Sequence, residues 1–281
     1  MLEGYPHTTL SQQHRMRPEI SALVRALTYP DLVDAPGTSG RPNLTGVRDN
    51  LILIHHDKPE DEMSDLADRA EGAKSSKQNA HEVEMVFKIV RYLIQQGYRT
   101  DNMVILTPYL GQLQKLNAKL KYLKETDTVL GDLDAQELAR AGLLTNGPSP
   151  GKRQLRLATI GICSSIFASV SNLALDNYQG EESDIVIASL TRSNSNHDIG
   201  FMHSAERVNV MLSRARNAFI MIGNVDTFEH ARKGQETWRP LLNNLRKGGH
   251  IYEGFPVKCE RHPTKVAIFV RLFGFASGYA Y

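Results

Sequence analysis

Residues 185–223 read IVIASLTRSNSNHDIGFMHSAERVNVMLSRARNAFIMIG, and this stretch decides the fold class. It opens on Ile185–Leu190 and closes on Ala218–Gly223, and neither of these apolar runs alternates with polar residues. Such runs are typical of strands covered on both faces, as in a parallel sheet. Between them, Ala205–Arg216 has the apolar spacing of a helix. The stretch therefore predicts a strand, a helix and a second strand, the repeating unit of α/β proteins.

The rest of the chain continues this alternation. Further strands are predicted at Leu51–His55, Met103–Thr107 and Leu155–Ile160. Further helices are predicted over residues 19–28, 81–96, 110–123 and 237–246. We expect an α/β fold in which a parallel sheet of five or more strands carries helices on both faces. Ligands of such sheets sit at the carboxyl ends of the strands, so functional side chains are expected there.

Composition excludes several classes of protein. The 281 residues include 33 Lys and Arg against 31 Asp and Glu, a formal net charge of +2, so nucleic acid cannot be bound by bulk charge alone. Cys163 and Cys259 are the only cysteines, which rules out a disulfide framework or a four-cysteine zinc site. No apolar stretch reaches the ~20 residues of a membrane-spanning helix. We expect a protein of a reducing compartment that has no membrane partner.

Three polar clusters stand beside the predicted strands and helices. They occupy residues 13–18 (QHRMRP), 176–184 (DNYQGEESD) and 207–216 (RVNVMLSRAR). In the third cluster, Arg207 and Arg214 are spaced to share one helix face with apolar residues. Arg suits bidentate phosphate contact, although an exposed basic helix edge gives the same pattern. Gly180 in the second cluster allows close backbone approach to a ligand, or belongs to an ordinary turn.

Together and in this order, the clusters resemble the second RecA-like domain of superfamily 1 RNA helicases of the up-frameshift type. Within that group the chain looks most like the large NFX-type zinc-finger helicases. The resemblance runs from about Thr9 to Asn224 and weakly on to Pro263. The matching blocks are LSQQHRMRPEIS, VILTPYLGQ, DNYQGEESDIVIASLTRSN, IGF and ERVNVMLSRARNAFIMIGN. The resemblance implies a RecA-like P-loop NTPase-type fold, a parallel sheet with helices on both faces.

The resemblance also implies roles on the nucleotide side. Arg15 and Arg214 match two arginine fingers that reach the γ-phosphate of ATP, where such fingers are worth about 10³–10⁵ in rate. Nucleotide contacts are implied for Gln13, His14, Gly180 and Glu182. His14 departs from the family pattern, because many relatives have a tyrosine there, expected near the adenine. Glu182 matches the carboxylate near the ribose or γ-phosphate.

A second set of residues is implied to contact nucleic acid. Thr107, Pro108 and Tyr109 match a loop that lies on the backbone of the single strand. Thr191, Arg192, Ser193 and Asn194 follow the end of a predicted strand and are expected to contact phosphates or a neighbouring domain. Tracking a single strand needs such hydroxyl, amide and Arg donors more than a large net charge.

One part of an ATPase is missing from the sequence. No GxxxxGK[ST] phosphate loop occurs, since GPSPGK at 147–152 has the wrong spacing and is followed by Arg153. In the family, the phosphate loop and the Mg²⁺ site belong to the first RecA-like domain. We therefore expect ATP and Mg²⁺ to be bound mainly by such a domain, supplied in cis or in trans. This chain would carry half of the site and would be inactive alone.

The expected domain organisation follows from the same blocks. Residues 1–246 are assigned to the second RecA-like domain, with an acidic loop at 57–77 and an uncharged insert at 161–175 that the family pattern lacks. Residues 247–281 are assigned to a tail that leads toward a zinc-finger region. The insert and residues 266–281 are hypothesised to be gene-model artefacts, with genuine segments as the alternative, and the chain to be a fragment.

The sequence thus predicts the C-terminal motor domain of an ATP-dependent RNA helicase. Its expected partner is single-stranded RNA, with DNA as the alternative, in the cytoplasm or in nuclear or RNA-granule association. A non-catalytic RNA- or protein-binding module and a truncated gene product are the competing readings. No metal site is expected, because His197, His203 and His230 lack ligand spacing with a third partner, and Cys259 and His262 are only two ligands.

Overall fold

The computed structural model describes residues 11–61, 77–126, 155–159, 182–259 and 262–269. Its centre is a six-stranded sheet in the order β5-β4-β6-β7-β3-β8. Every neighbouring pair in this sheet is parallel. In chain order the strands are β3 (Leu51–His55), β4 (Met103–Thr107), β5 (Arg156–Thr159), β6 (Ser183–Ser189), β7 (Ala215–Gly223) and β8 (Ile251–Tyr252). The α/β fold with a parallel sheet is confirmed.

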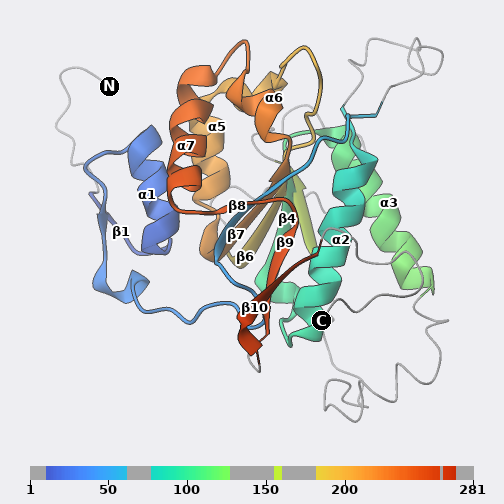
Figure 1. Cartoon of the computed structure of the whole chain (residues 1–281), viewed down its shortest axis with the longest axis horizontal. Helices are drawn as coiled ribbons and strands as arrows, with labels where there is room; N and C mark the ends of the chain where they lie inside the picture. The colour runs from blue at the N-terminus through green and yellow to red at the C-terminus, as the bar shows by residue number, and fades with distance from the viewer. Residues whose placement is uncertain (1–10, 62–76, 127–154, 160–181, 260–261, 270–281) are drawn as a thin grey trace, which may run out of the picture.

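Helices cover both faces of this sheet, as the sequence predicts. One face carries α1 (Pro18–Leu27), α5 (Ala205–Leu212) and α7 (Gln235–Lys247), and the other carries α2 (Ala80–Gln95) and α3 (Leu110–Thr126). Figure 1 shows the first three on the left of the sheet and the last two on the right. Along β3, Leu51 and Leu53 enter one core while Ile52 and Ile54 enter the other. The period of two residues thus gives each strand two apolar faces.

The helix predicted over Ala205–Arg216 is too long. α5 ends at Leu212, and β7 begins only three residues later at Ala215. Arg207 and Arg214 therefore do not share a helix face, which corrects the expectation from spacing. The reason is tertiary: the strand pairing of Ala215 with Ser183 outweighs the local helix propensity of the arginine-rich segment.

Several short elements are not anticipated by the sequence pattern. They are β1 (Gln12–Gln13), β2 (Val33–Asp34), α6 (Val225–Glu229), β9 (Phe255–Cys259), β10 (His262–Phe269) and the 3₁₀ turns η1 (Pro36–Thr38), η2 (Thr100–Asn102) and η4 (Gly200–His203). β8 pairs with β3, so the central sheet continues past residue 246. The assigned domain boundary itself stays a prediction. The hypothesised insert at 161–175, Gly180 and most of the acidic loop lie outside the described residues. Among the described helices, none is both long and apolar enough to cross a bilayer.

Candidate functional site

The residues singled out by sequence gather at opposite ends of the sheet. Arg214 and Glu182 immediately precede β7 and β6, so they stand at the amino ends of these strands. Tyr109 and Arg192 follow β4 and β6 at their carboxyl ends. Of these candidate residues, only the second group lies at the carboxyl ends, where the sequence analysis expects a ligand. The nucleotide-side residues lie at the other end, because the loop between β1 and α1 meets the turn between α5 and β7 there, where Arg15 contacts Ser213.

We define the amino-end arginine cluster as Arg15, Arg41, Glu182, Arg214 and Arg216. The Arg15 Nε lies 2.5 Å from Oε2 of Glu182, and its Nη1 donates to the carbonyl of Ser213 at 3.0 Å. The side chains of Arg15 and Glu182 are 33% and 38% exposed, so this ion pair is open to solvent. The cluster joins three sequence blocks that are far apart in the chain.

Gln13 fixes the backbone on which Arg15 stands. Its amide oxygen accepts from the backbone N–H of Arg15 at 2.9 Å and of Met16 at 2.7 Å. Its amide nitrogen donates to Asp34 at 2.6 Å, and the side chain is buried. Both ends of the Gln13 amide are therefore used inside the protein. The geometry favours a positioning role for Gln13 over direct contact with a ligand.

Positive charge is concentrated in this cluster. Arg41 donates to the carbonyls of Arg15 and, at 2.7 Å, of Arg216. Burial and the neighbouring charge of Arg216 lower the pKa of the Arg41 guanidinium below its ordinary value. Arg216 also lies 3.5 Å from Glu182 and 3.7 Å from Asp184. Arg15 and Arg216 are the arginines with ion pairs to these carboxylates, and Arg41 lies within electrostatic reach of both, so arginines outnumber carboxylates in this region.

The remaining nucleotide-side predictions are placed as follows. Arg214 is half-buried, and its carbonyl accepts from the backbone N–H of Ser183 at 3.0 Å, which fixes its turn against β6. His14 is exposed beside Arg15, and its carbonyl accepts from Arg41 at 3.3 Å. Gly180 lies outside the described residues. Arg15, Arg214, His14 and Glu182 are thus within one region of the molecule.

A pocket of about 860 Å³ opens at the other end of the sheet. We call it the carboxyl-end pocket. Its walls combine basic, polar and aromatic side chains with backbone from the 199–201 turn. It is lined by Lys77, Pro108, Tyr109, Leu110, Arg192, Asn196, Asp198, Ile199, Gly200, Phe201, His203, Arg232 and Lys233. An aromatic and basic lining of this kind suits the bases and phosphates of a nucleic acid strand.

Arg192 is built into the wall of this pocket. Its Nε donates to Glu60 at 2.8 Å and its Nη2 to Asp198 at 3.1 Å, and the side chain is only 6% exposed. Burial lowers the pKa of Arg192, but hydrogen bonds with Tyr109 and Glu60 outweigh burial and raise it above the ordinary value. Arg192 is therefore a cation whose Nε and Nη2 are paired with carboxylates of this chain.

A strained turn at Thr191 directs the side chain of Arg192 into the wall of the carboxyl-end pocket. Thr191 has a φ of 71°, a rare value for a β-branched residue, and the N–H of Arg192 donates to the carbonyl of Leu190 at 2.8 Å. Together these describe a γ-turn, which costs of order 1–3 kcal/mol. The Glu82 carboxylate accepts from the Thr191 N–H at 2.9 Å and from the Ser189 hydroxyl at 2.6 Å. Glu82 is wholly buried and holds the turn in place.

Two aromatic rings lie at the pocket, Tyr109 and Phe201. Their centroids are 5.8 Å apart, and the Tyr109 hydroxyl donates to the carbonyl of Ile199 at 3.0 Å. Phe201 is 54% exposed, and the Arg207 guanidinium lies 4.9 Å from its centroid. Gly200 has a φ of 51°, and a Cβ there would stand 2.4 Å from the Tyr109 hydroxyl. Only glycine permits this close packing of the turn.

The residues predicted to contact nucleic acid are indeed brought together here. Thr107 and Thr191 meet through their hydroxyls at 3.2 Å, and Asn194 donates to Glu60 at 3.1 Å. However, most of them are buried: Thr107, Pro108, Tyr109, Thr191, Arg192 and Ser193. They support the pocket, whereas the exposed groups that a ligand would meet first are Phe201 and the basic residues at the rim.

Sequence reasoning missed four residues that shape these two regions. Glu60 lies in a segment read as an acidic surface, and Glu82 in a helix read only for its apolar stripe. Arg41 lies between the predicted helix at 19–28 and the predicted strand at Leu51–His55, where no sequence pattern marks it. Phe201 is part of the IGF block, so that block was the available signal. Glu60 and Glu82 act through tertiary contacts, which spacing along the chain does not reveal.

The sequence profile of the family described as AAA domain matches residues 1–226. NFX1-type zinc finger-containing protein 1 of Mus musculus is 31% identical over 258 residues, which cover 92% of this chain and 11% of that protein. The Helicase required for RNAi-mediated heterochromatin assembly 1 of Schizosaccharomyces pombe is 27% identical, over 85% of this chain and 19% of its own. The Regulator of nonsense transcripts 1 homolog of Drosophila melanogaster is 24% identical, over 87% and 17%. The chain thus spans about a tenth to a fifth of these relatives.

Proposed function

The chain belongs to the AAA domain family and, with its relatives, to the superfamily 1 helicases, and from this we propose that it is the second motor lobe of an ATP-dependent RNA helicase. In this proposal the amino-end arginine cluster completes an ATP site on a partner lobe, and the carboxyl-end pocket holds a single strand. The observation that carries it is the convergence of Arg15, Arg214 and Glu182 at one end of the sheet.

The chemistry of the cluster fits a triphosphate. Arg15 is held by an exposed ion pair with Glu182, and exposed ion pairs are worth only about 0–1 kcal/mol. A γ-phosphate can therefore take the place of the carboxylate at little cost. The sequence contains no phosphate loop of its own, so that loop and Mg²⁺ would come from the partner lobe.

Arg15 and Arg214 would act on the transition state of phosphoryl transfer. A guanidinium placed at the γ-phosphate stabilises the charge that develops on its oxygens. Gln13 positions Arg15, because its amide oxygen accepts a hydrogen bond from the backbone N–H of Arg15 at 2.9 Å. Without a cradle to position the phosphates, these arginines have nothing to act on, so the chain alone should hydrolyse no ATP.

The carboxyl-end pocket would hold the single strand. Phe201 offers an exposed ring on which a base can stack, and Lys77, Arg232 and Lys233 line the pocket for phosphates. The names of the relatives refer to RNAi and to nonsense transcripts, which favours RNA over DNA. Arg192 and the buried hydroxyls keep the pocket in shape rather than bind phosphate directly.

Both regions are anchored to β6, which runs from Ser183 to Ser189. A rigid strand in the middle of a sheet makes the two ends move as one body. Closure of the two lobes around ATP would therefore move the pocket along the single-stranded RNA. Hydrolysis of the ATP would then let the lobes open again.

The test supplies a first RecA-like lobe in trans and measures ATP hydrolysis with and without single-stranded RNA. The proposal expects no hydrolysis by this chain alone and RNA-stimulated hydrolysis by the mixture. Binding of RNA with no effect of this chain on hydrolysis would favour the non-catalytic binding module instead.

A further inference from the structure

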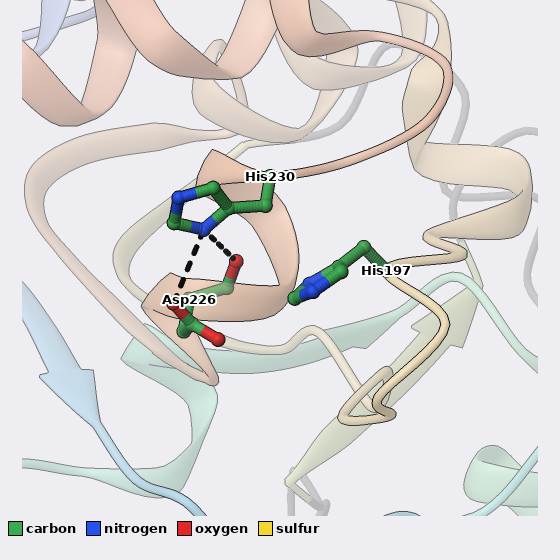
Figure 2. A group of neighbouring side chains, drawn as sticks. All are labelled: His197, Asp226 and His230. Atoms are coloured by element: carbon green, nitrogen blue, oxygen red, sulfur yellow. Dashed lines mark hydrogen bonds and ion pairs between the residues drawn. The ribbon is translucent and has the colours of Figure 1, made fainter.

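Figure 2 shows a group of three side chains that belong to neither region defined above: His197, Asp226 and His230. One ligand atom from each lies within 4.8 Å of the others. Asp226 and His230 belong to α6 and its C-cap, whereas His197 comes from the loop after β6. The ring of His197 points from that loop toward the other two side chains (Figure 2).

Backbone hydrogen bonds hold His197 so that its ring lies 5.5 Å from that of His230, measured between centroids. Its φ of 51° is in the left-handed region, which is uncommon for a residue other than glycine. Its backbone N–H donates to Asn194 at 3.3 Å, and its carbonyl accepts from Arg232 at 3.1 Å. Its Nδ1 is buried and has no hydrogen-bond partner among the described residues. Buried polar atoms are normally paired, so an unpaired imidazole nitrogen here calls for a ligand.

We propose that His197, Asp226 and His230 bind a divalent transition-metal ion of the zinc class. Two imidazoles and one carboxylate are ligands that suit Zn²⁺, Co²⁺ or Ni²⁺. Mg²⁺ and Ca²⁺ prefer oxygen ligands and do not fit this set. Three protein ligands leave one position of a tetrahedral ion for water.

The geometry needs only a small adjustment to bind the ion. Ligand atoms around one tetrahedral Zn²⁺ lie about 3.3 Å apart, given bonds of about 2.0–2.1 Å. The side chains of Asp226 and His230 are 65% and 52% exposed, so they are free to rotate toward His197. Their present ion pair, with Nδ1 and Oδ1 at 3.1 Å, is exchanged for bonds to the metal. Any proton on an imidazole is released to water, because only the neutral ring ligates.

Metal binding would tie the loop after β6 to α6. The sequence offers His197 and His230 without a third partner, and it is the short helix α6 that brings Asp226 beside them. This inference stands on these three residues alone, and it holds whether or not the chain is a helicase lobe.

The test is a titration of the metal-free chain with Zn²⁺ by isothermal calorimetry, followed by the absorption spectrum of the Co²⁺ form. His197→Asn is the main variant, because Asn accepts a left-handed φ and preserves the loop. His230→Gln is the second, and His203→Gln, at an exposed histidine of the carboxyl-end pocket, is the matched control. We expect each of the first two to weaken Zn²⁺ binding by roughly tenfold or more and the control by less than about twofold.

The spectrum separates this site from one built on cysteine. The wild-type Co²⁺ form should show no thiolate charge-transfer band, since neither Cys163 nor Cys259 belongs to the group. Unchanged Zn²⁺ affinity in both His197→Asn and His230→Gln, with unfolding curves of the metal-free variants matching the wild type, would overturn the proposal. A strong thiolate band would overturn it as well.

Discussion

The two ends of the sheet are built in opposite ways. At the amino end, Arg15 and Glu182 are each about one third exposed and hold each other by an ion pair that a ligand can replace. At the carboxyl end, Arg192 is 6% exposed and locked between Glu60 and Asp198, behind a strained turn held by the buried Glu82. One region is open to solvent, whereas the other is held in place by contacts within this chain. From this contrast we expect substitutions at the amino end to lower ATP hydrolysis. Substitutions at the carboxyl end should instead lower stability or RNA affinity.

The largest effect is expected from Arg15. Arg15→Ala should lower RNA-stimulated ATP hydrolysis in the mixture with a first lobe by about 10³-fold or more, because a finger at the γ-phosphate is lost. Arg15→Lys should recover little of this, since an ammonium lacks the planar fork. The assay is steady-state phosphate release.

Arg239→Ala is the matched control, because Arg239 is an exposed arginine of α7 that does not belong to the cluster and donates to the carbonyl of Glu229. An equal loss in this control, or full activity of Arg15→Ala, would argue that the amino end is not a nucleotide site.

Glu82 should give the largest change in stability. Glu82→Ala removes the acceptor of the Thr191 N–H, the Ser189 hydroxyl and the Nε2 of His56, and so leaves three buried groups short of one hydrogen bond each. We expect the free energy of unfolding to fall by about 2–4 kcal/mol, measured by urea denaturation.

Glu84→Ala, on the same helix, is the control. Its ion pair with Lys119 is exposed and should be worth about 0–0.5 kcal/mol. Similar losses in the two variants would mean that the carboxyl end is not held by the buried network.

Phe201 separates RNA binding from folding. Phe201→Ala should weaken binding of a single-stranded oligoribonucleotide by about 5- to 150-fold, because stacking is worth about 1–3 kcal/mol per base. Fluorescence anisotropy at constant salt measures this. Tyr29→Ala, which removes another aromatic ring that is exposed but lies outside the pocket, should leave the affinity unchanged. If both variants bind alike, Phe201 is no stacking platform.

The smallest effect concerns acid stability at the amino end. Burial raises the pKa of Asp34, but hydrogen bonds from Ser21, Gln13 and Arg25 outweigh burial and place it below the ordinary value of 3.8. The stabilisation is therefore complete above about pH 4 and is lost as the pH falls through the lower native pKa.

In Asp34→Asn the decline of unfolding free energy at acid pH should be shallower than in the wild type. Asp31→Asn, at an exposed neighbour in the chain, controls for loss of a carboxylate. A slope in Asp34→Asn that matches the wild type would show that Asp34 does not carry this stabilisation.

The sequence predicts the strands and helices of this molecule better than the side-chain contacts of its two candidate regions. β3 and β4 have the predicted bounds, because uninterrupted apolar runs between turn residues leave little choice. The blocks around Arg15, Glu182 and Arg214 point to one site, and the structure brings them together. The end of α5 is misjudged, because a strand pairing far along the chain decides it.

The support of the carboxyl-end pocket could not be predicted in the same way. The γ-turn at Thr191 is held by the buried carboxylate of Glu82, which lies more than a hundred residues earlier in the chain. Glu60 is equally remote from Arg192. No period or spacing encodes such contacts, and the burial of predicted donors such as Thr107 and Ser193 follows from the same packing.

The most direct test of the account compares Arg15→Ala and Phe201→Ala in one experiment. With a first lobe in trans, the RNA concentration is varied, and ATP hydrolysis is followed to saturation for each variant. The account predicts that Arg15→Ala abolishes the maximal rate while RNA affinity stays at the wild-type value. Phe201→Ala should shift the half-saturating RNA concentration while the maximal rate is retained. If both variants change the same parameter, the amino end of the sheet does not serve ATP hydrolysis separately from RNA binding at the carboxyl end, and the account is contradicted.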